Sequence, residues 1–180
     1  MSCVACAAPG EGVLCRRCGE TLRRAPERWL DGVLVRSAFV HEGAARALVH
    51  RIKYQAVPLP AVGRTLAPLV PPGATALVPI PRVTARRWRY GGDPALEIAR
   101  SLAAISRLPV LTALQAPIWV HRRAGRSGEI HGRARFRRRA PVPPGAVLVD
   151  DVVTTGATLL AAASVTGCTA AVTFTSALRP

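Results

Sequence analysis

Two adjacent carboxylates, Asp150 and Asp151, follow an apolar run in the stretch VLVDDVVTTGATL at residues 147–159. The chain has only 10 acidic residues against 25 basic ones, so such a pair is unexpected. A Thr-Thr-Gly turn at residues 154–156 follows, and a turn of this kind that opens a helix directs free N–H groups at an anion. Carboxylates repel phosphate, but they accept charge-assisted hydrogen bonds from a sugar diol. The stretch therefore predicts a site for a ribose with a 5′-phosphate; the alternative is a strand, two solvated aspartates and a Thr-capped helix.

Four cysteines near the N-terminus have the spacing Cys-x2-Cys-x8-Cys-x2-Cys, at Cys3, Cys6, Cys15 and Cys18. Each Cys-x-x-Cys pair can wrap a tight turn around one tetrahedral ion. A segment this short cannot bury a core, so the metal would supply its folding free energy. The spacing predicts a structural zinc site. Two disulfides or a redox pair are the alternatives, and disulfides require an oxidising compartment.

The residues around these sites must be positioned by regular elements, which the apolar patterns locate. We expect an Arg-rich linker over 20–31, strands at 33–40, 74–80, 110–114, 146–149 and 170–177, and helices at 43–53, 61–70, 95–108 and 157–165. The strands are uniformly apolar and alternate with helices, which favours an α/β fold with a parallel sheet covered on both faces. Ligands of such sheets bind beyond the carboxyl ends of the strands, where residues 150–156 fall. The fifth cysteine, Cys168, lies in an apolar stretch and is expected in the core.

Composition and charge narrow the class of partner. The chain has 180 residues and 49% apolar residues, without a run long enough to span a membrane. The N-terminus has no basic-then-apolar signal pattern, so we expect a soluble, cytoplasmic protein. A net charge of +15 favours anionic partners, namely phosphates or nucleic acid. The alternative is a basic surface that serves solubility alone.

The most basic stretch, residues 119–140, holds eight arginines and a single acid, Glu129, between His121 and Arg139. The arginines are Arg122, Arg123, Arg126, Arg133, Arg135, Arg137, Arg138 and Arg139. Eight exceed what one diphosphate can use, so they indicate a longer polyanion. We expect single-stranded DNA, with Trp119, Phe136 and either Trp88 or Tyr90 as stacking surfaces. A solvated basic loop is the alternative.

The stretch at 147–159 resembles the phosphoribosyl-pyrophosphate (PRPP) loop of type I phosphoribosyltransferases. The remainder resembles the competence-associated ComF/ComFC branch of that fold, through the four-cysteine element, HRIKY at 50–54, LVPIPR at 77–82 and the later Arg-rich stretch. The resemblance implies a type I phosphoribosyltransferase-like domain over residues 30–180, with a parallel sheet flanked by helices. A four-cysteine zinc-knuckle element over residues 1–22 would precede it.

The resemblance also implies roles for individual residues. At the catalytic centre, Asp150 and Asp151 would hold the ribose 2′ and 3′ hydroxyls, and Arg82 would lie in the pyrophosphate loop. The 5′-phosphate would be held by Val152, Val153, Thr154, Thr155, Gly156, Ala157 and Thr158. Mg²⁺ is expected to accompany PRPP, because charge builds up on the leaving pyrophosphate.

Two functional hypotheses of different classes follow. In the first, the protein binds PRPP and acts in DNA uptake and transformation by binding single-stranded DNA, with a competence helicase as a further partner. In the second, it is an active phosphoribosyltransferase that transfers ribose 5-phosphate to an acceptor. The intact PRPP loop favours PRPP binding, whereas the surplus of arginines and the cysteine element favour a binding role.

Overall fold

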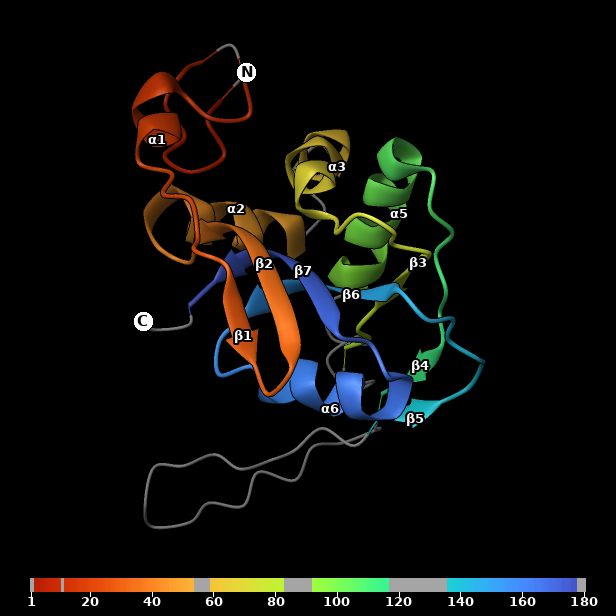
Figure 1. Ribbon diagram of the computed structural model, residues 1–180. Helices are drawn as coiled ribbons and strands as arrows, with labels where there is room; N and C mark the ends of the chain where they lie inside the picture. The colour runs from red at the N-terminus through yellow and green to blue at the C-terminus, as the bar shows by residue number, and fades with distance from the viewer. Residues whose placement is uncertain (1, 11, 54–58, 83–91, 117–135, 178–180) are drawn as a thin grey trace.

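The computed structural model describes residues 2–10, 12–53, 59–82, 92–116 and 136–177 of the chain (Figure 1). At its centre is a five-stranded sheet with the strand order β1-β2-β7-β6-β3. The strands are β1 (Arg28–Leu30), β2 (Val33–Val40), β3 (Ala76–Pro79), β6 (Ala146–Val153) and β7 (Ala170–Ser176). Neighbouring strands from β2 to β3 all pair in parallel, which confirms the predicted α/β class with a mainly parallel sheet.

The first strand departs from the parallel pattern. β1 pairs with β2 in the antiparallel sense through a hairpin whose two turn residues, Asp31 and Gly32, both have positive φ angles. An Asp-Gly pair is favoured in such two-residue turns, because their twist matches that of the strands. The predicted linker over 20–31 is therefore wrong at its end, where Arg28–Leu30 form the edge of the sheet.

Helices cover both faces of the sheet (Figure 1). One face carries α2 (Gly43–Lys53), α3 (Leu59–Leu66) with the short 3-10 helix η1 (Ala67–Leu69), and α5 (Pro94–Ser106). The other face carries α6 (Ala157–Thr166) and a small antiparallel pair formed by β4 (Leu114–Gln115) and β5 (Arg137–Arg138). The short α1 (Arg16–Glu20) belongs to the N-terminal cysteine segment. No helix in the described ranges is long and apolar enough to cross a lipid bilayer.

Two hydrophobic clusters lie between these layers. The cluster under α2, α3 and α5 contains Leu77, Ile98 and Leu102, all without exposed surface, and the cluster under α6 contains Leu148 and the predicted core residue Cys168. Burying one such large side chain stabilises the fold by about 1.5–3 kcal/mol. The sheet is therefore a rigid platform for the residues at its edges.

The predicted strand at 110–114 is only partly present. Val110 forms a single parallel bridge to Leu77 beside β3, and the chain becomes extended again as β4. Hydrogen bonds join Leu77 to Pro109 and Leu111, but the pairing with β3 ends there. The residues that follow form β4, which pairs with β5.

The topology defines where a ligand is expected. β3 and β6 are neighbours, but the next described helix after β3 is α5 on one face, whereas β6 leads into α6 on the other face. The chain therefore leaves these two neighbouring strands toward opposite faces of the sheet. The crevice at the carboxyl ends of two such strands is where α/β sheets characteristically bind ligands. Arg82 follows β3 closely, and Asp150 and Asp151 lie near the carboxyl end of β6.

Candidate functional site

The two aspartates lie inside β6, because this strand runs to Val153 instead of ending at residue 149 as predicted. β7 continues beside it to Ser176, so the parallel ladder extends past the acids and pairs Asp150 with Thr173. The prediction that both acids follow the strand is therefore wrong. Both side chains are partly buried at the carboxyl edge of the sheet.

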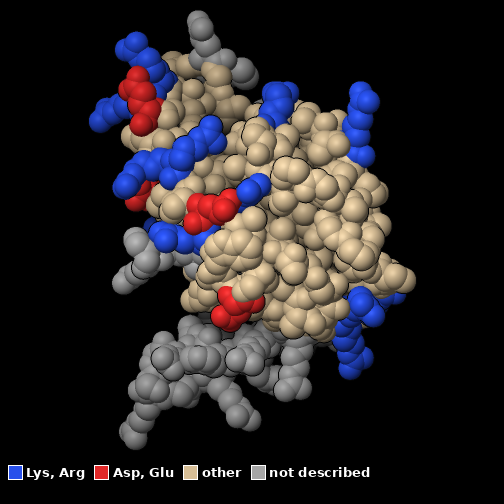
Figure 2. Space-filling model, viewed as in Figure 1, with Lys and Arg blue, Asp and Glu red and all other residues tan. Residues whose placement is uncertain are grey.

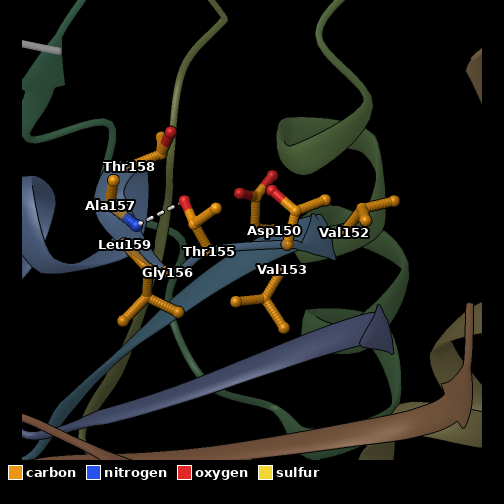
Figure 3. Close-up of a pocket in the computed structure, with 9 residues that line it drawn as sticks. Asp150, Val152, Val153, Thr155, Gly156, Ala157, Thr158 and Leu159 are labelled. Carbon is orange, nitrogen blue, oxygen red and sulfur yellow. Dashed lines mark hydrogen bonds between the residues drawn. The ribbon is translucent and has the colours of Figure 1, made fainter. Parts of the chain in front are cut away.

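The loop between β6 and α6 forms a small open pocket (Figure 3). Its lining includes the whole predicted phosphate loop, residues 152–158, together with Asp150 and Leu159. The side-chain oxygens of Asp150, Thr155 and Thr158 lie on one side of the loop in Figure 3, and the Ala157 N–H donates to Thr155 Oγ1 at 3.4 Å. The first N–H groups of a helix have no intrahelical partners, so this end of α6 offers donors to an anion.

Gly156 is required at the start of α6 for two reasons. Its φ angle is +79°, in the left-handed region, and it occupies the N-cap position of the helix. A Cβ atom at this position would lie 2.6 Å from Leu30 Cδ1, far inside van der Waals contact. The β1–β2 hairpin therefore packs directly against the loop. Sequence reasoning missed this support, although the Asp-Gly turn was a signal for it.

The Asp150 carboxyl is held in an environment that disfavours its charged form. Burial raises its pKa well above the ordinary value of 3.8, and the neighbouring Asp151 carboxylate and Asp93 raise it further. The Asp151 N–H, which donates to Asp150 Oδ1 at 2.8 Å, acts in the opposite direction and is outweighed. Asp150 therefore retains a proton more readily than an ordinary aspartate, and in that state it can both donate and accept a hydrogen bond.

The Asp151 carboxylate is paired with two cations from distant parts of the chain. Lys53 Nζ, at the end of α2, lies 3.4 Å from Asp151 Oδ2, and Arg82 Nη2 lies 3.7 Å from the same oxygen. The side chains of Asp151 and Arg82 are only 14% and 17% exposed. Asp151 Oδ2 is itself buried and has no hydrogen bond from any described residue. The predicted site residues Arg82 and Asp151 are thus brought together, and Lys53 joins them.

His41 is a further polar residue at this edge of the sheet. It directly follows β2, and its Nδ1 lies 2.8 Å from Thr175 Oγ1. Partial burial lowers its pKa, as do the positive charges of Lys53 and Arg46, whereas Asp151 raises it. Sequence reasoning missed His41. Its signal was its position, since a polar residue at the carboxyl end of an apolar parallel strand points to the ligand-binding edge.

The four N-terminal cysteines come together as predicted. Their sulfur atoms all lie within 4.8 Å of one another, and Cys6 Sγ is 3.7 Å from Cys15 Sγ. A tetrahedral zinc ion with sulfur atoms at about 2.3 Å requires sulfur–sulfur distances of about 3.8 Å, so the cluster fits such an ion. All four are free thiols in the structure. The cysteines can therefore bind a metal such as zinc.

Hydrogen bonding within the cluster shifts the pKa values of Cys3 and Cys18 in opposite directions. The backbone N–H of Cys15 contributes most to lowering the pKa of Cys3 to about 6. Hydrogen bonding to the Cys6 side chain contributes most to raising the pKa of Cys18 to about 12. Backbone donors directed at a sulfur favour its thiolate form, which is the form that ligates metals.

Most of the predicted nucleic-acid contacts lie outside the described residues. These are Arg122, Arg123, Arg126, Arg133 and Arg135, together with the aromatic residues Trp88, Tyr90 and Trp119. Arg137, Arg138 and Arg139 are described and are exposed, and none of the three pairs with a carboxylate within the described ranges. Arg139 Nε donates to Gln115 Oε1 at 2.9 Å.

The assignment of Phe136 as a stacking surface is wrong. Its side chain is only 6% exposed and belongs to the core cluster under α6, because the β4–β5 pair folds it inward. An exposed aromatic residue is instead Trp29 in β1, at 67%. A base can stack only on an exposed ring, so Trp29 replaces Phe136 as a candidate among the described residues.

Basic residues elsewhere on the surface are partly neutralised. Figure 2 shows acidic side chains interspersed among basic ones on one face. Arg23 pairs with Glu42 at 3.3 Å, and Arg36 pairs with Glu27 at 2.6 Å. Exposed pairs of this kind contribute little to stability, at about 0–1 kcal/mol each. These ion pairs reduce the positive charge that this part of the surface can offer to a polyanion.

Comparison with known proteins does not assign the chain to a class. No family model matches it, and no curated protein sequence matches it. The functional conclusion therefore rests on the residues and the geometry of the site.

Proposed function

We propose that the protein binds PRPP and is similar to the ComF/ComFC proteins of the type I phosphoribosyltransferase fold. The observation that carries the proposal is the pocket at the carboxyl end of β6, where Asp150 and the β6–α6 loop share one lining. Hydroxyl groups, a helix N-terminus and a glycine that allows close approach suit a phosphate. A carboxyl group beside them suits a sugar hydroxyl.

The separate parts of PRPP match separate parts of the site. The loop at residues 152–158 is suited to the 5′-phosphate, and Asp150 and Asp151 to the ribose hydroxyls. Arg82 and Lys53 are the described cations that pair with Asp151, and they are suited to the diphosphate. Mg²⁺ bound with PRPP would neutralise charge on the diphosphate. The chain's own cations would hold and orient that group beside the sugar.

The cysteine cluster is proposed to hold one structural zinc ion through Cys3, Cys6, Cys15 and Cys18. The sulfur separations and the backbone donors to Cys3 support this assignment. Apolar residues of the same segment, including Val4, Val13 and Leu14, pack against the core cluster beneath α2. Zinc would therefore stabilise a segment that is in contact with the main domain.

The biological role that we propose is DNA uptake and transformation in the cytoplasm, with single-stranded DNA and a helicase as partners. The net charge of +15 supports binding of a polyanion. So do Arg137, Arg138 and Arg139, which are exposed and pair with no carboxylate of the described residues. Trp29 supplies an exposed ring for base stacking. The competence role itself comes from the resemblance to ComF proteins.

A second candidate function is phosphoribosyl transfer. In that reaction the bond between C1 of the ribose and the diphosphate oxygen breaks, and pyrophosphate leaves with the electron pair. An acceptor nucleophile then forms a bond to C1 and loses a proton. The observation that favours this candidate is the pair of cations, Lys53 and Arg82, which are suited to the leaving pyrophosphate.

One experiment tests the proposal and separates the two candidates. Wild-type protein is titrated with PRPP and Mg²⁺ by calorimetry, and pyrophosphate release is followed with and without purine and pyrimidine bases. Saturable binding without release supports a PRPP-binding module, and acceptor-dependent release supports a transferase. The Asp150→Ala/Asp151→Ala double variant should bind more than tenfold more weakly, since a charge-assisted contact of the kind assigned to Asp151 contributes about 1.5–3 kcal/mol and the Asp150 contact is lost as well. Absence of PRPP binding by the wild type would refute both candidates.

A further inference from the structure

Asp151 has ion-pair partners that are also the cations best placed for a ligand's diphosphate. Both Lys53 and Arg82 approach the same carboxylate oxygen, Asp151 Oδ2, at 3.4 Å and 3.7 Å. Asp151 is not among the residues that line the β6–α6 pocket, whereas Asp150 is. The two adjacent acids therefore have different surroundings, which calls for different roles.

We propose that Asp151 determines specificity by competing with anionic ligands for Lys53 and Arg82, so that the site rejects bare anions and accepts those that also carry hydroxyl groups. This inference rests on the proposed PRPP site and deepens it. A bare diphosphate that approaches the two cations meets the negative charge of Asp151. A ligand with a sugar diol gives Asp151 new hydrogen-bond donors at the moment when the cations turn to the diphosphate.

The geometry of the ion pairs suits such an exchange. Strong charge-assisted hydrogen bonds have donor–acceptor distances of about 2.7–2.9 Å, and both contacts to Asp151 Oδ2 are longer. The oxygen is buried and accepts no hydrogen bond from the described part of the chain, so it is held there by charge alone. Hydroxyl groups brought by a ligand would satisfy this oxygen. Exchanging these cations for the hydroxyl groups of a ligand therefore costs less free energy than breaking a directed, bidentate ion pair.

The other titratable groups near Asp151 do not substitute for it. Burial and the Asp151 charge both raise the pKa of Asp150, so Asp150 holds a proton more readily than an ordinary aspartate. Partial burial and the charges of Lys53 and Arg46 lower the pKa of His41, which favours the neutral ring. Asp151 is thus the acid on which the two cations converge, and its charge decides how strongly they attract another anion.

The test is Asp151→Asn, which keeps the shape of the side chain and removes its charge. Inorganic pyrophosphate is titrated without added divalent cations, and PRPP is titrated with Mg²⁺. A carboxylate about 6 Å from a diphosphate charge, at an effective dielectric constant of about 40, changes affinity about tenfold. We therefore expect pyrophosphate to bind about tenfold more tightly to the variant. The preference for PRPP over pyrophosphate should fall by at least the same factor.

Two further variants make the result specific. Glu97→Gln removes one negative charge from α5, where Glu97 pairs with Arg100, and should leave pyrophosphate affinity unchanged. Lys53→Gln combined with Asp151→Asn should lose most of the gain, because one of the released cations is then missing. Circular dichroism and melting curves establish that each variant is folded, and the double variant tests the coupling even if Asp151→Asn lowers the melting temperature.

The outcomes separate this inference from the proposed function. If the wild type binds PRPP but Asp151→Asn binds pyrophosphate no more tightly, the competition is refuted and the PRPP site stands. If the wild type does not bind PRPP but Asp151→Asn still gains pyrophosphate affinity through Lys53, the PRPP assignment fails. Asp151 would then still compete with anions for the two cations. An equal gain in Glu97→Gln would assign the effect to net charge and overturn the inference.

Discussion

Replacing Gly156 with alanine tests the loop at the start of α6 most directly. Gly156 has φ +79°, and a Cβ atom there would lie 2.6 Å from Leu30 Cδ1. Gly167, at the other end of the same helix, has φ +74°, and a Cβ atom added to it would meet no heavy atom of the described residues within 4 Å. Gly167→Ala is therefore a matched control, because it introduces the same backbone strain without the contact.

The two substitutions differ by a free energy that can be worked out from these contacts. A left-handed conformation costs a non-glycine residue about 1–2 kcal/mol, and this cost is common to both. Carbon atoms require about 3.5–4.0 Å, so Gly156→Ala must displace the Leu30 methyl by about 1 Å. Such overpacking costs about 1–3 kcal/mol, and the lower end applies because the methyl ends a side chain that can move. We expect Gly156→Ala to be about 1 kcal/mol less stable than Gly167→Ala.

Thermal melts and ligand titrations measure the two consequences. For a domain of this size, 1 kcal/mol corresponds to about 2–4 °C in melting temperature. Gly156→Ala should also bind PRPP more weakly, because its methyl group and the displaced hairpin alter the phosphate loop. Gly167→Ala should retain wild-type affinity, because it lies at the far end of α6. Equal melting temperatures for the two variants, together with equal PRPP affinities, would refute the role given to Gly156 and Leu30.

Three other predictions concern charge and metal. Burial, and then the Asp151 charge, raise the pKa of Asp150 above its unfolded value, so the wild type should lose stability as pH rises above about 4 through that raised pKa. Asp150→Asn should remove this loss and melt at a higher temperature than the wild type at pH 7, while binding PRPP more weakly. A variant that melts below the wild type at pH 7 would contradict this prediction. Purified protein should contain about one zinc per chain by elemental analysis; Cys15→Ser should lose the metal and Cys168→Ala should keep it, and zinc-free wild type prepared without chelators would exclude the site. Serine at Arg137 and Arg138 should weaken binding of single-stranded DNA and reduce the slope of log K against log salt by up to about 1.4, with PRPP binding unchanged; an unaltered slope would place the DNA site elsewhere.

The local elements of the sheet and helices follow from the sequence because their apolar patterns are strong. The strand at 33–40 and the helix at 43–53 have the predicted bounds, and α6 and β7 differ from theirs by one residue at the carboxyl end. Uniformly apolar strands require cover on both faces, so the parallel sheet was also predictable. β1 was missed because an edge strand of three residues is too short to show a periodicity. Only its Asp-Gly turn marks it.

The assembly of the charged site could not be predicted in the same way. Lys53 ends α2, Arg82 follows β3 and Asp151 lies near the end of β6, and the strand order places β6 directly beside β3. No local pattern encodes that strand order. The sequence indicated that Arg82 and Asp151 follow or end apolar strands. The predicted helix at 43–53 placed Lys53 at a helix end, and the structure adds its ion pair with Asp151.

The adjacent acids in this strongly basic chain can be understood from their separate surroundings. Two charged carboxylates side by side repel each other, and the site reduces that repulsion in two ways. Asp151 is balanced by two cations, whereas Asp150 is partly buried and its raised pKa reduces its negative charge. One acid can therefore exchange partners with an incoming ligand, and the other can offer both a donor and an acceptor to a hydroxyl group. A basic protein that bound every phosphate equally would be saturated by common anions, and a retained carboxylate at the cations is a direct physical means of selecting a phosphorylated sugar.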